Sequence, residues 1–253
     1  MDFSEKVVIV TGASSGVGAA CAILFAKHGA KLTVIGRNEE RLGNVIKKCV
    51  ENNNKVPLAL ILDLTLSGSC ENAIKRTVEA YGRIDVLVNC AGTMTMSSLY
   101  DESPDAFDEM MNINLRVPYK LTQLAVPHLV KTKGNVVNLS TAMLNRVRPG
   151  FMLYAVAKAG LAKFTRVAGM ELASEGVRVN AVSLGITRTN FMENLNMDKK
   201  ASEAAYDRLK AELPTGNILE PEEAAKFIVI IASDMFPNLT GSILTMDGGF
   251  SLA

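Results

Sequence analysis

The stretch K-V-V-I-V-T-G-A-S-S-G-V-G, residues 6–18, decides the fold of this chain. Its first half, Lys6–Thr11, is a run of β-branched residues, which is typical of a strand buried on both faces of a sheet. Its second half, Thr11–Gly18, places three glycines where a helix begins. In that setting glycines let the backbone turn tightly and approach a pyrophosphate, while the helix N-terminus offers N–H groups and positive partial charge. The stretch therefore predicts a dinucleotide site, with the spacing G-x-x-x-G-x-G instead of the more general G-x-G-x-x-G.

Strand and helix patterns alternate from this stretch to the end of the chain. Such alternation implies parallel strands joined by right-handed crossovers, with helices on both faces of the sheet. We therefore predict an α/β fold: one doubly wound Rossmann domain over residues 1–253 with a mainly parallel sheet. Its least regular segment, Ile186–Asn217, either covers the substrate or is a surface insertion with short helices of its own. Strands are expected at Lys6–Thr11, Lys31–Ile35, Leu58–Leu62, Asp85–Asn89, Asn135–Leu139, Val177–Val182 and Ser242–Met246, and helices at Val17–His28, Glu39–Glu51, Ser69–Tyr81, within Ser103–Met111 and Leu115–Lys131, and at Tyr154–Ser174 and Pro221–Ser233.

Composition narrows the possible classes of protein. The 253 residues, 48% of them hydrophobic, are enough for one sizeable core. A net charge of +1 gives no basic excess that would indicate a nucleic-acid partner. No apolar run approaches the roughly 20 residues that span a bilayer. The N-terminus goes straight into a strand without the pattern of a signal peptide, so a cytoplasmic protein without a membrane partner is expected.

Metal and disulfide chemistry have little support in the sequence. The cysteines are scattered without metal-ligand spacing, which is typical of reduced, mostly buried thiols. The two histidines, His28 and His128, lie far apart in the sequence, so neither a histidine-based metal site nor a histidine triad is indicated. We expect no metal cofactor. The four cysteines are Cys21, Cys49, Cys70 and Cys90.

Tyr154 and Lys158 stand four residues apart, as Y-A-V-A-K, in an alanine-rich helical pattern. This spacing puts both side chains on one face of a helix. A free Tyr has a pKa of about 10, and each unit of change corresponds to about 1.4 kcal/mol. One positive charge about 4 Å away supplies roughly 4 kcal/mol at an effective dielectric near 20, enough to bring a phenol to about neutral pH. The pair therefore suggests a tuned acid, although the spacing alone also fits a solvated surface pair.

The end of the second predicted strand bears on the choice of dinucleotide. An NAD enzyme usually places an acidic residue here, about 20 positions after the glycine loop, to hold the ribose 2′-hydroxyl. This chain has Gly36, Arg37 and Asn38 instead. Because Arg pairs bidentately with phosphate oxygens, the exchange favours NADP(H) over NAD(H). The alternative is that Arg37 only starts the charged helix R-N-E-E-R.

With these residues in place, the chain resembles the short-chain dehydrogenase/reductase family, in its common single-domain branch, over essentially its full length. The N-C-A-G segment at Asn89–Gly92 is similar to the family's N-N-A-G, with Cys90 in place of the second Asn. The remaining matches are Thr11–Gly18 for the cofactor loop, Asp63-Leu64 for the pair that contacts adenine, Asn114 for the catalytic Asn, Tyr154 and Lys158 for the Y-x-x-x-K centre, and Asp247–Gly249 for a motif of packing and subunit contacts.

The resemblance implies hydride transfer between nicotinamide and a carbonyl or alcohol carbon. Tyr154 would give its proton to the carbonyl oxygen, and Lys158 would lower the Tyr154 pKa and hold the nicotinamide ribose. The Asn114 backbone would hold a water that links Lys158 to solvent. Together with the loop, the resemblance assigns to the cofactor Gly12, Ser14, Ser15, Gly16, Val17, Gly18, Arg37, Asn38, Asp63, Leu64, Asn89, Ala91, Gly92, Tyr154, Lys158, Gly185, Ile186, Thr187 and Thr189.

Two positions depart from the family pattern. The catalytic Ser of the family lies thirteen residues before the Tyr, where this chain has Thr141. Thr keeps the hydroxyl but is stiffer, and we predict that it takes the role, because the neighbouring Ser140 should point the other way on an extended backbone. Ser183-Leu184-Gly185 replaces the usual N-P-G, and without the Pro this wall is expected to be less pre-organised.

The expected substrate is a hydrophobic carbonyl or alcohol, such as a steroid-like, isoprenoid or fatty acyl compound. The pattern is nearest to the 3-oxoacyl-ACP reductase-like members. The alternative function is a catalytically weak NADP(H)-binding redox sensor or scaffold. The three departures from the family pattern, at Thr141, Leu184 and Cys90, are consistent with a loss of catalytic activity. Candidate pocket walls, largely apolar, are Thr93–Met96, Met143–Arg148, Phe151 and Leu184–Met192.

Other classes and branches fit the sequence less well. Extended epimerases and dehydratases use another glycine spacing and a longer substrate domain, and divergent enoyl reductases put six residues, not three, between Tyr and Lys. A nucleotide-binding methyltransferase has no need of the Tyr–Lys pair.

The helix Tyr154–Ser174 also bears on assembly. It carries small residues that permit close helix packing, either on the sheet or between subunits: Ala155, Ala159, Ala162 and Gly169. The resemblance implies a homo-oligomer through this helix, a tetramer in preference to a dimer.

Overall fold

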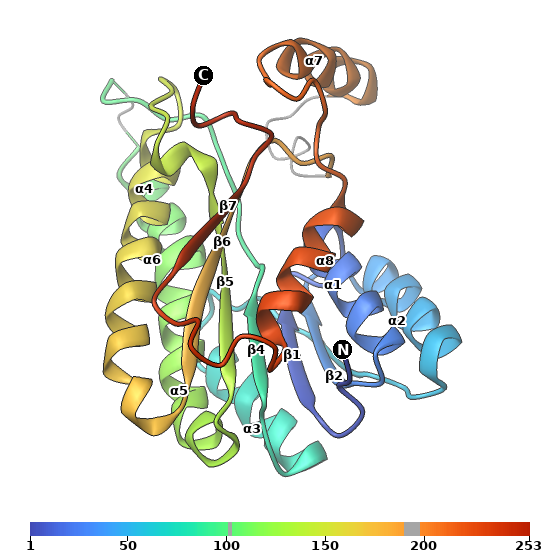
Figure 1. Cartoon of the computed structure of the whole chain (residues 1–253). Coiled ribbons are helices and arrows are strands. Elements are labelled where there is room, and N and C mark those ends of the chain that lie inside the picture. Colours follow the sequence, from blue (N-terminus) through green and yellow to red (C-terminus); the bar gives the residue numbers. More distant parts are fainter. Residues whose placement is uncertain (101–102, 190–197) are drawn as a thin grey trace.

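Seven strands form one parallel sheet, in the order β3-β2-β1-β4-β5-β6-β7, in the computed structural model of the chain (Figure 1). The structure describes residues 1–100, 103–189 and 198–253. The predicted doubly wound α/β fold is confirmed, with a sheet that is parallel at every pairing. The strands are β1 (Val7–Thr11), β2 (Lys31–Gly36), β3 (Leu58–Ile61), β4 (Val86–Asn89), β5 (Asn135–Thr141), β6 (Arg178–Leu184) and β7 (Ile243–Met246).

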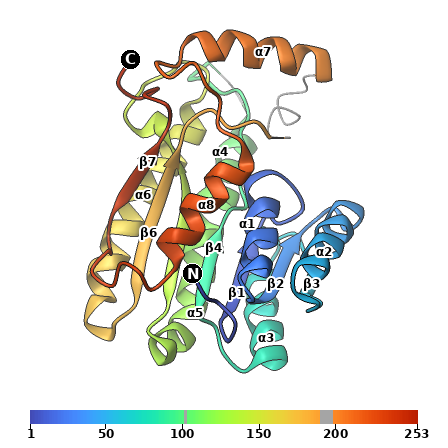
Figure 2. The ribbon, with the colours of Figure 1, turned by 45° about the vertical axis from the view of Figure 1, so that its right-hand side comes forward.

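Helices cover both faces of the sheet (Figures 1 and 2). One face carries α1, α2 and α8, and the other carries α3, α5 and α6. The helices are α1 (Gly16–Lys27), α2 (Glu39–Asn53), α3 (Ser69–Tyr81), α4 (Pro104–Met111), α5 (Val117–Thr132), α6 (Met152–Glu171), α7 (Lys199–Ala211) and α8 (Pro221–Ala232). Short helical segments lie at Asn112–Arg116 (a π-helix), Ala142–Leu144 and Ala173–Glu175.

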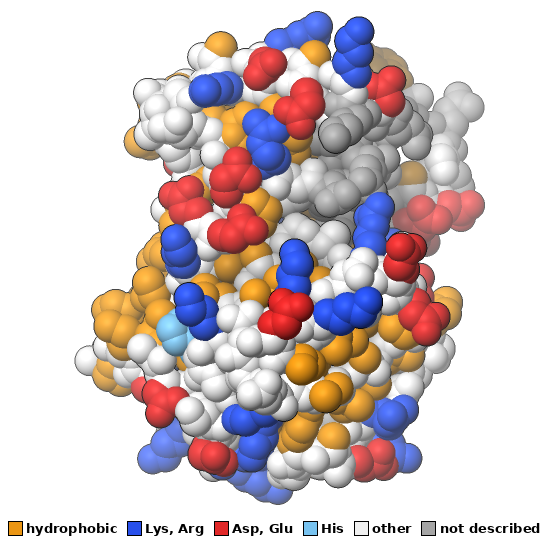
Figure 3. Space-filling view, turned by 90° about the vertical axis from the view of Figure 1, so that its right-hand side faces the viewer, with side chains coloured by type: hydrophobic (Ala, Val, Ile, Leu, Met, Phe, Trp, Pro, Cys, Tyr) orange, Lys and Arg blue, Asp and Glu red, His pale blue; other side chains and the backbone are white. Residues whose placement is uncertain are grey.

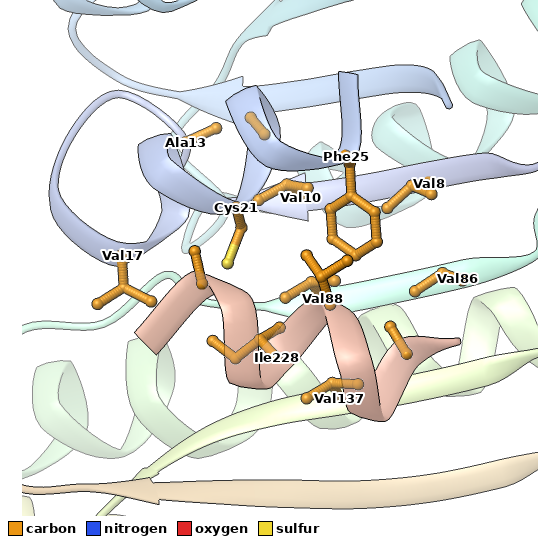
Figure 4. Packing of buried hydrophobic residues seen from close by; sticks show 14 of the residues in the cluster. Val8, Val10, Ala13, Val17, Cys21, Phe25, Val86, Val88, Val137 and Ile228 are labelled. Atoms are coloured by element: carbon orange, nitrogen blue, oxygen red, sulfur yellow. The ribbon is translucent and has the colours of Figure 1, made fainter. Parts of the chain in front are cut away.

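The core lies in two layers because side chains of the buried strands alternate between the two faces. Val8 and Val10 of β1 pack towards α1 and α8, where Phe25 and Ile228 meet them (Figure 4). Ile9, between them, belongs to the layer on the opposite face. A strand buried on both sides needs apolar residues at every position, which explains the unbroken run that precedes the glycine loop.

The strand order reverses direction between β1 and β4, because β1 pairs with β2 on one side and β4 on the other. Open α/β sheets bind ligands at the carboxyl ends of the strands at such a point. Thr11 ties the two strand ends together: its Oγ1 accepts hydrogen bonds from the Cys90 and Ala91 backbone N–H groups at 3.0 and 2.9 Å. The glycine loop and the Asn89–Gly92 segment therefore flank the predicted site.

The segment Ile186–Asn217 is more regular than the sequence indicated. It contains α7, whose first turn is capped by Asp198 through a 2.7 Å bond from the Ala201 N–H. Its start pairs with its far flank, at the bridge between Thr187 and Leu219. Residues 190–197 of this segment lie outside the described residues. Its second half thus has helical structure of its own, and a cover over the substrate stays a prediction.

Surface charge, helix length and side-chain clusters bear on nucleic-acid, membrane and metal partners. Lys and Arg side chains are interspersed with Asp and Glu over the face drawn in Figure 3, as the small net charge leads one to expect. Among the helices that the structure describes, none has the length and apolar character needed to cross a membrane. The same residues contain no group of three or more His, Cys, Asp or Glu side chains that could hold a metal ion.

Candidate active site

A cavity of about 1180 Å³ opens at the carboxyl ends of the strands. It brings the Tyr154–Lys158 pair together with Thr141 and Asn114, which precede the pair in the sequence by 13 to 44 residues. Of the predicted cofactor residues, all but Asn89 line it: Gly12, Ser14, Ser15, Gly16, Val17, Gly18, Arg37, Asn38, Asp63, Leu64, Ala91, Gly92, Tyr154, Lys158, Gly185, Ile186, Thr187 and Thr189.

Asn89 has a different position from the one predicted. Its side chain is buried in the sheet, where Nδ2 donates to Oδ1 of Asn138 at 2.8 Å, and Asn138 in turn donates to Thr165 at 2.9 Å. These bonds join β4, β5 and α6. Since buried amides need partners, the Asn89 side chain is a structural link and not a cofactor contact.

The glycine loop leaves no room for a side chain at Gly12 or Gly18. Gly12 has φ +64°, and a Cβ there would lie 2.9 Å from the Ala91 nitrogen. A Cβ at Gly18 would lie 2.3 Å from the Gly12 oxygen, so α1 begins in direct contact with the loop. Within the part of the chain that the structure describes, Ser15 gives α1 no side-chain cap, and the first turn holds no acidic residue. This helix N-terminus therefore fits the pyrophosphate of a dinucleotide.

Arginine lines the cavity beyond β2. Arg37 Nη1 lies 3.5 Å from Asp63 Oδ2, and its side chain is 75% exposed. An exposed pair of this kind contributes only about 0–1 kcal/mol, so Arg37 remains available to an anion. Arg41, in the first turn of α2, lines the same wall. The sequence did not single out Arg41, because Arg37 precedes the helix and helical spacing does not relate the two side chains.

Asn38 and Asp63 shape this end of the cavity. Asn38 caps α2, since its Oδ1 accepts from the Arg41 N–H at 2.8 Å. Burial raises the pKa of Asp63, but the hydrogen bonds from Thr65 and the charge of Arg37 outweigh it, so that the pKa lies below its usual value. A charged Asp63 therefore holds Arg37 at the rim of the cavity.

Tyr154 and Lys158 are buried, with 7% and 4% of their surfaces exposed, so the interpretation as a solvated surface pair is wrong. Lys158 Nζ donates to the Leu139 carbonyl at 2.8 Å and lies 5.7 Å from the centre of the Tyr154 ring. Burial raises the pKa of Tyr154 to about 12 and lowers that of Lys158 to about 8. Loss of solvent disfavours both charged forms, and the hydrogen bond from Thr141 only partly offsets it for the Tyr154 pKa.

Thr141, at the end of β5, contacts Tyr154. A hydrogen bond between their hydroxyl groups opposes the effect of burial on the Tyr154 pKa. Thr141 Oγ1 also accepts from the Met143 N–H at 3.3 Å. The Ser140 hydroxyl is buried and finds no hydrogen-bond partner among the residues described. The contact that the family's Ser would make is therefore available to Thr141.

Asn114 lies in the π-helical turn Asn112–Arg116, between α4 and α5. Such turns widen the helix and are frequent at functional sites. The Asn114 side chain is fully buried and donates to the Thr93 carbonyl at 2.9 Å. A Cβ at Gly92 would lie 2.7 Å from Asn114 Oδ1 and 3.6 Å from Lys158 Nζ, so both groups converge on this glycine.

The departures at Leu184 and Cys90 have structural accounts. Leu184 continues β6 two residues beyond the predicted end, pairs with Thr141 and Met246, and buries its side chain in the core. A residue with an N–H can join the ladder here, where a Pro could not donate to it, and the expected loosening of this wall stays a prediction. Cys90 lines the cavity, and its thiol is hydrogen-bonded to that of Cys21 in α1.

The far end of the cavity is formed by side chains. Of the predicted walls, Thr95, Met96, Leu144–Val147 and Arg188 do not line the cavity, and 190–192 lie outside the described residues; those that do are Thr93, Met94, Met143, Arg148, Phe151, Leu184–Thr187 and Thr189. Arg148 is paired with Glu212 at 3.2 Å. Phe250 also lines the cavity and was not predicted. Lining residues of α7 lie within Ile186–Asn217, the predicted substrate cover, but the sequence did not single them out: Ala205, Tyr206, Arg208, Leu209 and Glu212.

Comparison with known proteins gives matches over nearly the whole chain. A family model described as enoyl-(acyl carrier protein) reductase matches residues 12–251. A 3-oxoacyl-[acyl-carrier-protein] reductase of Thermotoga maritima is 35% identical over 250 residues, 98% of this chain and 99% of the relative. The (2S)-[(R)-hydroxy(phenyl)methyl]succinyl-CoA dehydrogenase subunit BbsD of Thauera aromatica is 31% identical, over 100% and 99%. A solved short-chain dehydrogenase/reductase of unknown function from Caenorhabditis elegans, with cofactor, has a TM-score of 0.94 and 34% identity, over 99% of this chain and 97% of that one.

Proposed function

The chain belongs to the short-chain dehydrogenase/reductase family, an oxidoreductase family that acts on carbonyls and alcohols with a nicotinamide cofactor, and on this premise we propose that it uses NADP(H) on a small, largely apolar substrate. The observation that carries the proposal is the single cavity that joins the glycine loop to the buried Tyr154 and its partner Thr141.

In the reductive direction Tyr154 gives its phenolic proton to the carbonyl oxygen. Its pKa of about 12 keeps the phenol protonated at neutral pH, as a proton donor requires. Thr141 donates a hydrogen bond to the same oxygen, and the charge of Lys158 favours the phenolate that remains. Nicotinamide, when bound, supplies the hydride that reduces the carbonyl carbon. Asn114 fixes the turn beside Lys158 and so holds the proton path to solvent in place.

Preference for NADP(H) rests on the cavity wall beyond β2. Arg37 and Arg41 line it, and the place of the usual acidic residue is taken by Gly36–Asn38. The guanidinium groups match a 2′-phosphate in charge and geometry. Asp63, which follows the neighbouring strand β3, pairs with Arg37, so this acid faces the arginine instead of binding the ribose itself.

The substrate class follows from the far end of the cavity. Methionine and aromatic side chains lie there, together with the Arg148–Glu212 pair, Arg208 and Thr93 as polar groups. A relative named for 3-oxoacyl groups on acyl carrier protein is 35% identical. We therefore place fatty acyl, isoprenoid and steroid-like carbonyl compounds first among candidate substrates.

A deuteride-transfer screen tests this function. The protein is incubated with NADPH carrying deuterium at C4 and a panel of ketones, diketones, quinones and 3-oxoacyl thioesters, and products are analysed by mass spectrometry. Deuterium on the alcohol carbon of an apolar product is expected, with lower turnover from NADH. Cofactor binding without transfer to any panel member would instead support the alternative, a redox sensor or scaffold.

We also propose that the chain assembles as a homotetramer through α6. Exposed apolar residues follow one stripe of this helix: Met152, Val156, Val167 and Met170. Gly169 does not belong to it, because a Cβ there would lie 2.5 Å from the Gly241 nitrogen within the same chain. Sedimentation of the wild type and of Val156→Glu tests the interface: a monomeric wild type would contradict it.

A further inference from the structure

The Tyr206 hydroxyl joins helix α7 to the segment Ile186–Thr189. It accepts a hydrogen bond from the Thr189 N–H at 3.1 Å, and it is placed to donate to the Thr189 carbonyl at 3.0 Å or to the Thr187 carbonyl at 3.4 Å. The Tyr206 side chain is only 3% exposed. Neither the glycine loop nor the catalytic group explains why a buried hydroxyl is placed here.

The segment that Tyr206 holds lies at the cofactor end of the cavity. Thr187 and Thr189 both line it. A Cβ at Gly16 would lie 3.0 Å from Cγ2 of Thr189, so the Thr189 side chain lies directly against the first residue of α1. A dinucleotide at the start of α1 therefore meets the segment that Tyr206 fixes.

The helix that carries Tyr206 forms part of the substrate end. Leu209 and Glu212, one to two turns further along, line the cavity, and Glu212 reaches Arg148 across it. Arg188 supports the same link, with Nη1 at 2.7 Å from Glu203 of α7 and its guanidinium stacked 4.8 Å from the centre of the Tyr206 ring. Through the Tyr206 hydroxyl, helix α7 at the substrate end of the cavity is thus bonded to Thr187 and Thr189 at the cofactor end.

We propose that Tyr206 is a positioning residue that couples cofactor binding at Thr187–Thr189 to the seating of α7 over the substrate end. The inference rests on the proposed function, since it requires NADP(H) in the cavity. Cofactor that orders Thr187–Thr189 also orders α7 through the hydroxyl, and by linkage a seated α7 strengthens cofactor binding by the same factor. Without the hydroxyl, the hydrogen bonds between α7 and the backbone of Thr187 and Thr189 are lost, and the two regions move independently.

Hydrogen exchange measured by mass spectrometry tests the coupling without turnover. The wild type, Tyr206→Phe and Tyr81→Phe are compared with and without NADP⁺. Tyr81 is a matched control, because its hydroxyl also bridges two backbone groups, accepting from the Leu58 N–H at 3.1 Å and donating to the Leu32 carbonyl at 3.0 Å, away from the cavity. Peptides from α1 report cofactor binding, and peptides from α7 report the seating of the helix.

In the wild type, NADP⁺ should slow exchange in both α1 and α7. In Tyr206→Phe we expect the α1 protection to remain at saturating NADP⁺, the α7 protection to disappear, and the Kd for NADP⁺ to rise about tenfold, within the range of known couplings. Tyr81→Phe should keep both protections and the wild-type Kd.

Loss of α7 protection in both variants, or its retention in Tyr206→Phe, would overturn the coupling while leaving the proposed function intact. A wild type whose α1 is not protected by NADP⁺ or NADPH would overturn the proposed function and the coupling with it.

Discussion

The nucleotide end of the cavity and its substrate end are built from different parts of the chain. At the nucleotide end, the wall is mainly backbone: glycines that tolerate no Cβ and a helix N-terminus that follows β1 directly. At the substrate end, side chains from the loop after β5, from α6, from α7 and from the C-terminus converge. The first end recognises what all dinucleotides share, and the second end decides which molecule reacts.

The difference predicts how substitutions act. Changes at side chains of the catalytic and substrate end should reduce turnover and leave cofactor binding intact. Changes to the charged rim of the nucleotide end should alter cofactor choice and leave the chemical step intact.

Tyr154→Phe should have the largest effect. Removing the proton donor is expected to lower kcat by about 10²- to 10⁴-fold, since general acids contribute that much, while the ring still fills its buried site. Steady-state kinetics with the screened substrate give kcat, and titration with NADPH gives the Kd, which should stay within about twofold of wild type. A kcat within tenfold of wild type would remove Tyr154 from the chemical step.

Thr141→Ala should come next, with kcat/KM lower by about 10²-fold, as for the loss of one donor to a developing oxyanion. Ser140→Ala is the matched control, because the Ser140 hydroxyl has no partner among the described residues. Thr141→Ser should restore most of the rate, since it keeps the hydroxyl. A larger loss in Ser140→Ala than in Thr141→Ala would transfer the role to Ser140.

Arg37→Ala tests the nucleotide end. A charge-assisted bond to phosphate contributes about 1.5–3 kcal/mol, so the NADPH KM should rise roughly tenfold or more while the NADH KM changes little. Lys47→Ala, which removes an exposed positive charge of α2 outside the cavity lining, should affect neither. Equal effects of Arg37→Ala on the two cofactors would contradict the assignment.

Lys158→Met should give the smallest effect, on stability. Burial lowers the Lys158 pKa from 10.5 to about 8, so at pH 7 the native protein carries a disfavoured buried charge. The apolar Met should therefore raise the free energy of unfolding at pH 7 by about 1–2 kcal/mol, after loss of the bond to Leu139.

The pH dependence of this gain has a definite sign. Between pH 8 and 10.5 the unfolded wild type holds the Lys158 proton and the folded one does not. The wild type is then stabilised as pH rises, so the advantage of Lys158→Met should shrink over this interval. Urea unfolding at pH 7 and pH 10 measures it, and a gain that grows with pH would show that Lys158 is not disfavoured by burial.

The sequence predicted the nucleotide end of the cavity better than the substrate end, and the reason is physical. The glycine loop, Arg37 and the Tyr154–Lys158 pair are local patterns whose geometry follows from one strand end or one helical turn. Asn89 was assigned wrongly, because its neighbours face the cavity while the period of the strand turns its own side chain towards Asn138. The Tyr154 pKa, expected to be lowered by the Lys158 charge, is raised by burial. A charge is visible in a sequence, whereas the depth of burial is not.

The sequence by itself determined the parallel sheet, the place of the dinucleotide loop and the identity of the buried pair at the catalytic centre, because each is written within a few consecutive residues. Only the tertiary structure decided that Thr141 contacts Tyr154, that Gly92 receives Asn114 and Lys158, and that Tyr206 joins α7 to Thr189. These contacts join residues that stand between 13 and 66 positions apart in the sequence, and side chains meet there through packing that no local pattern specifies.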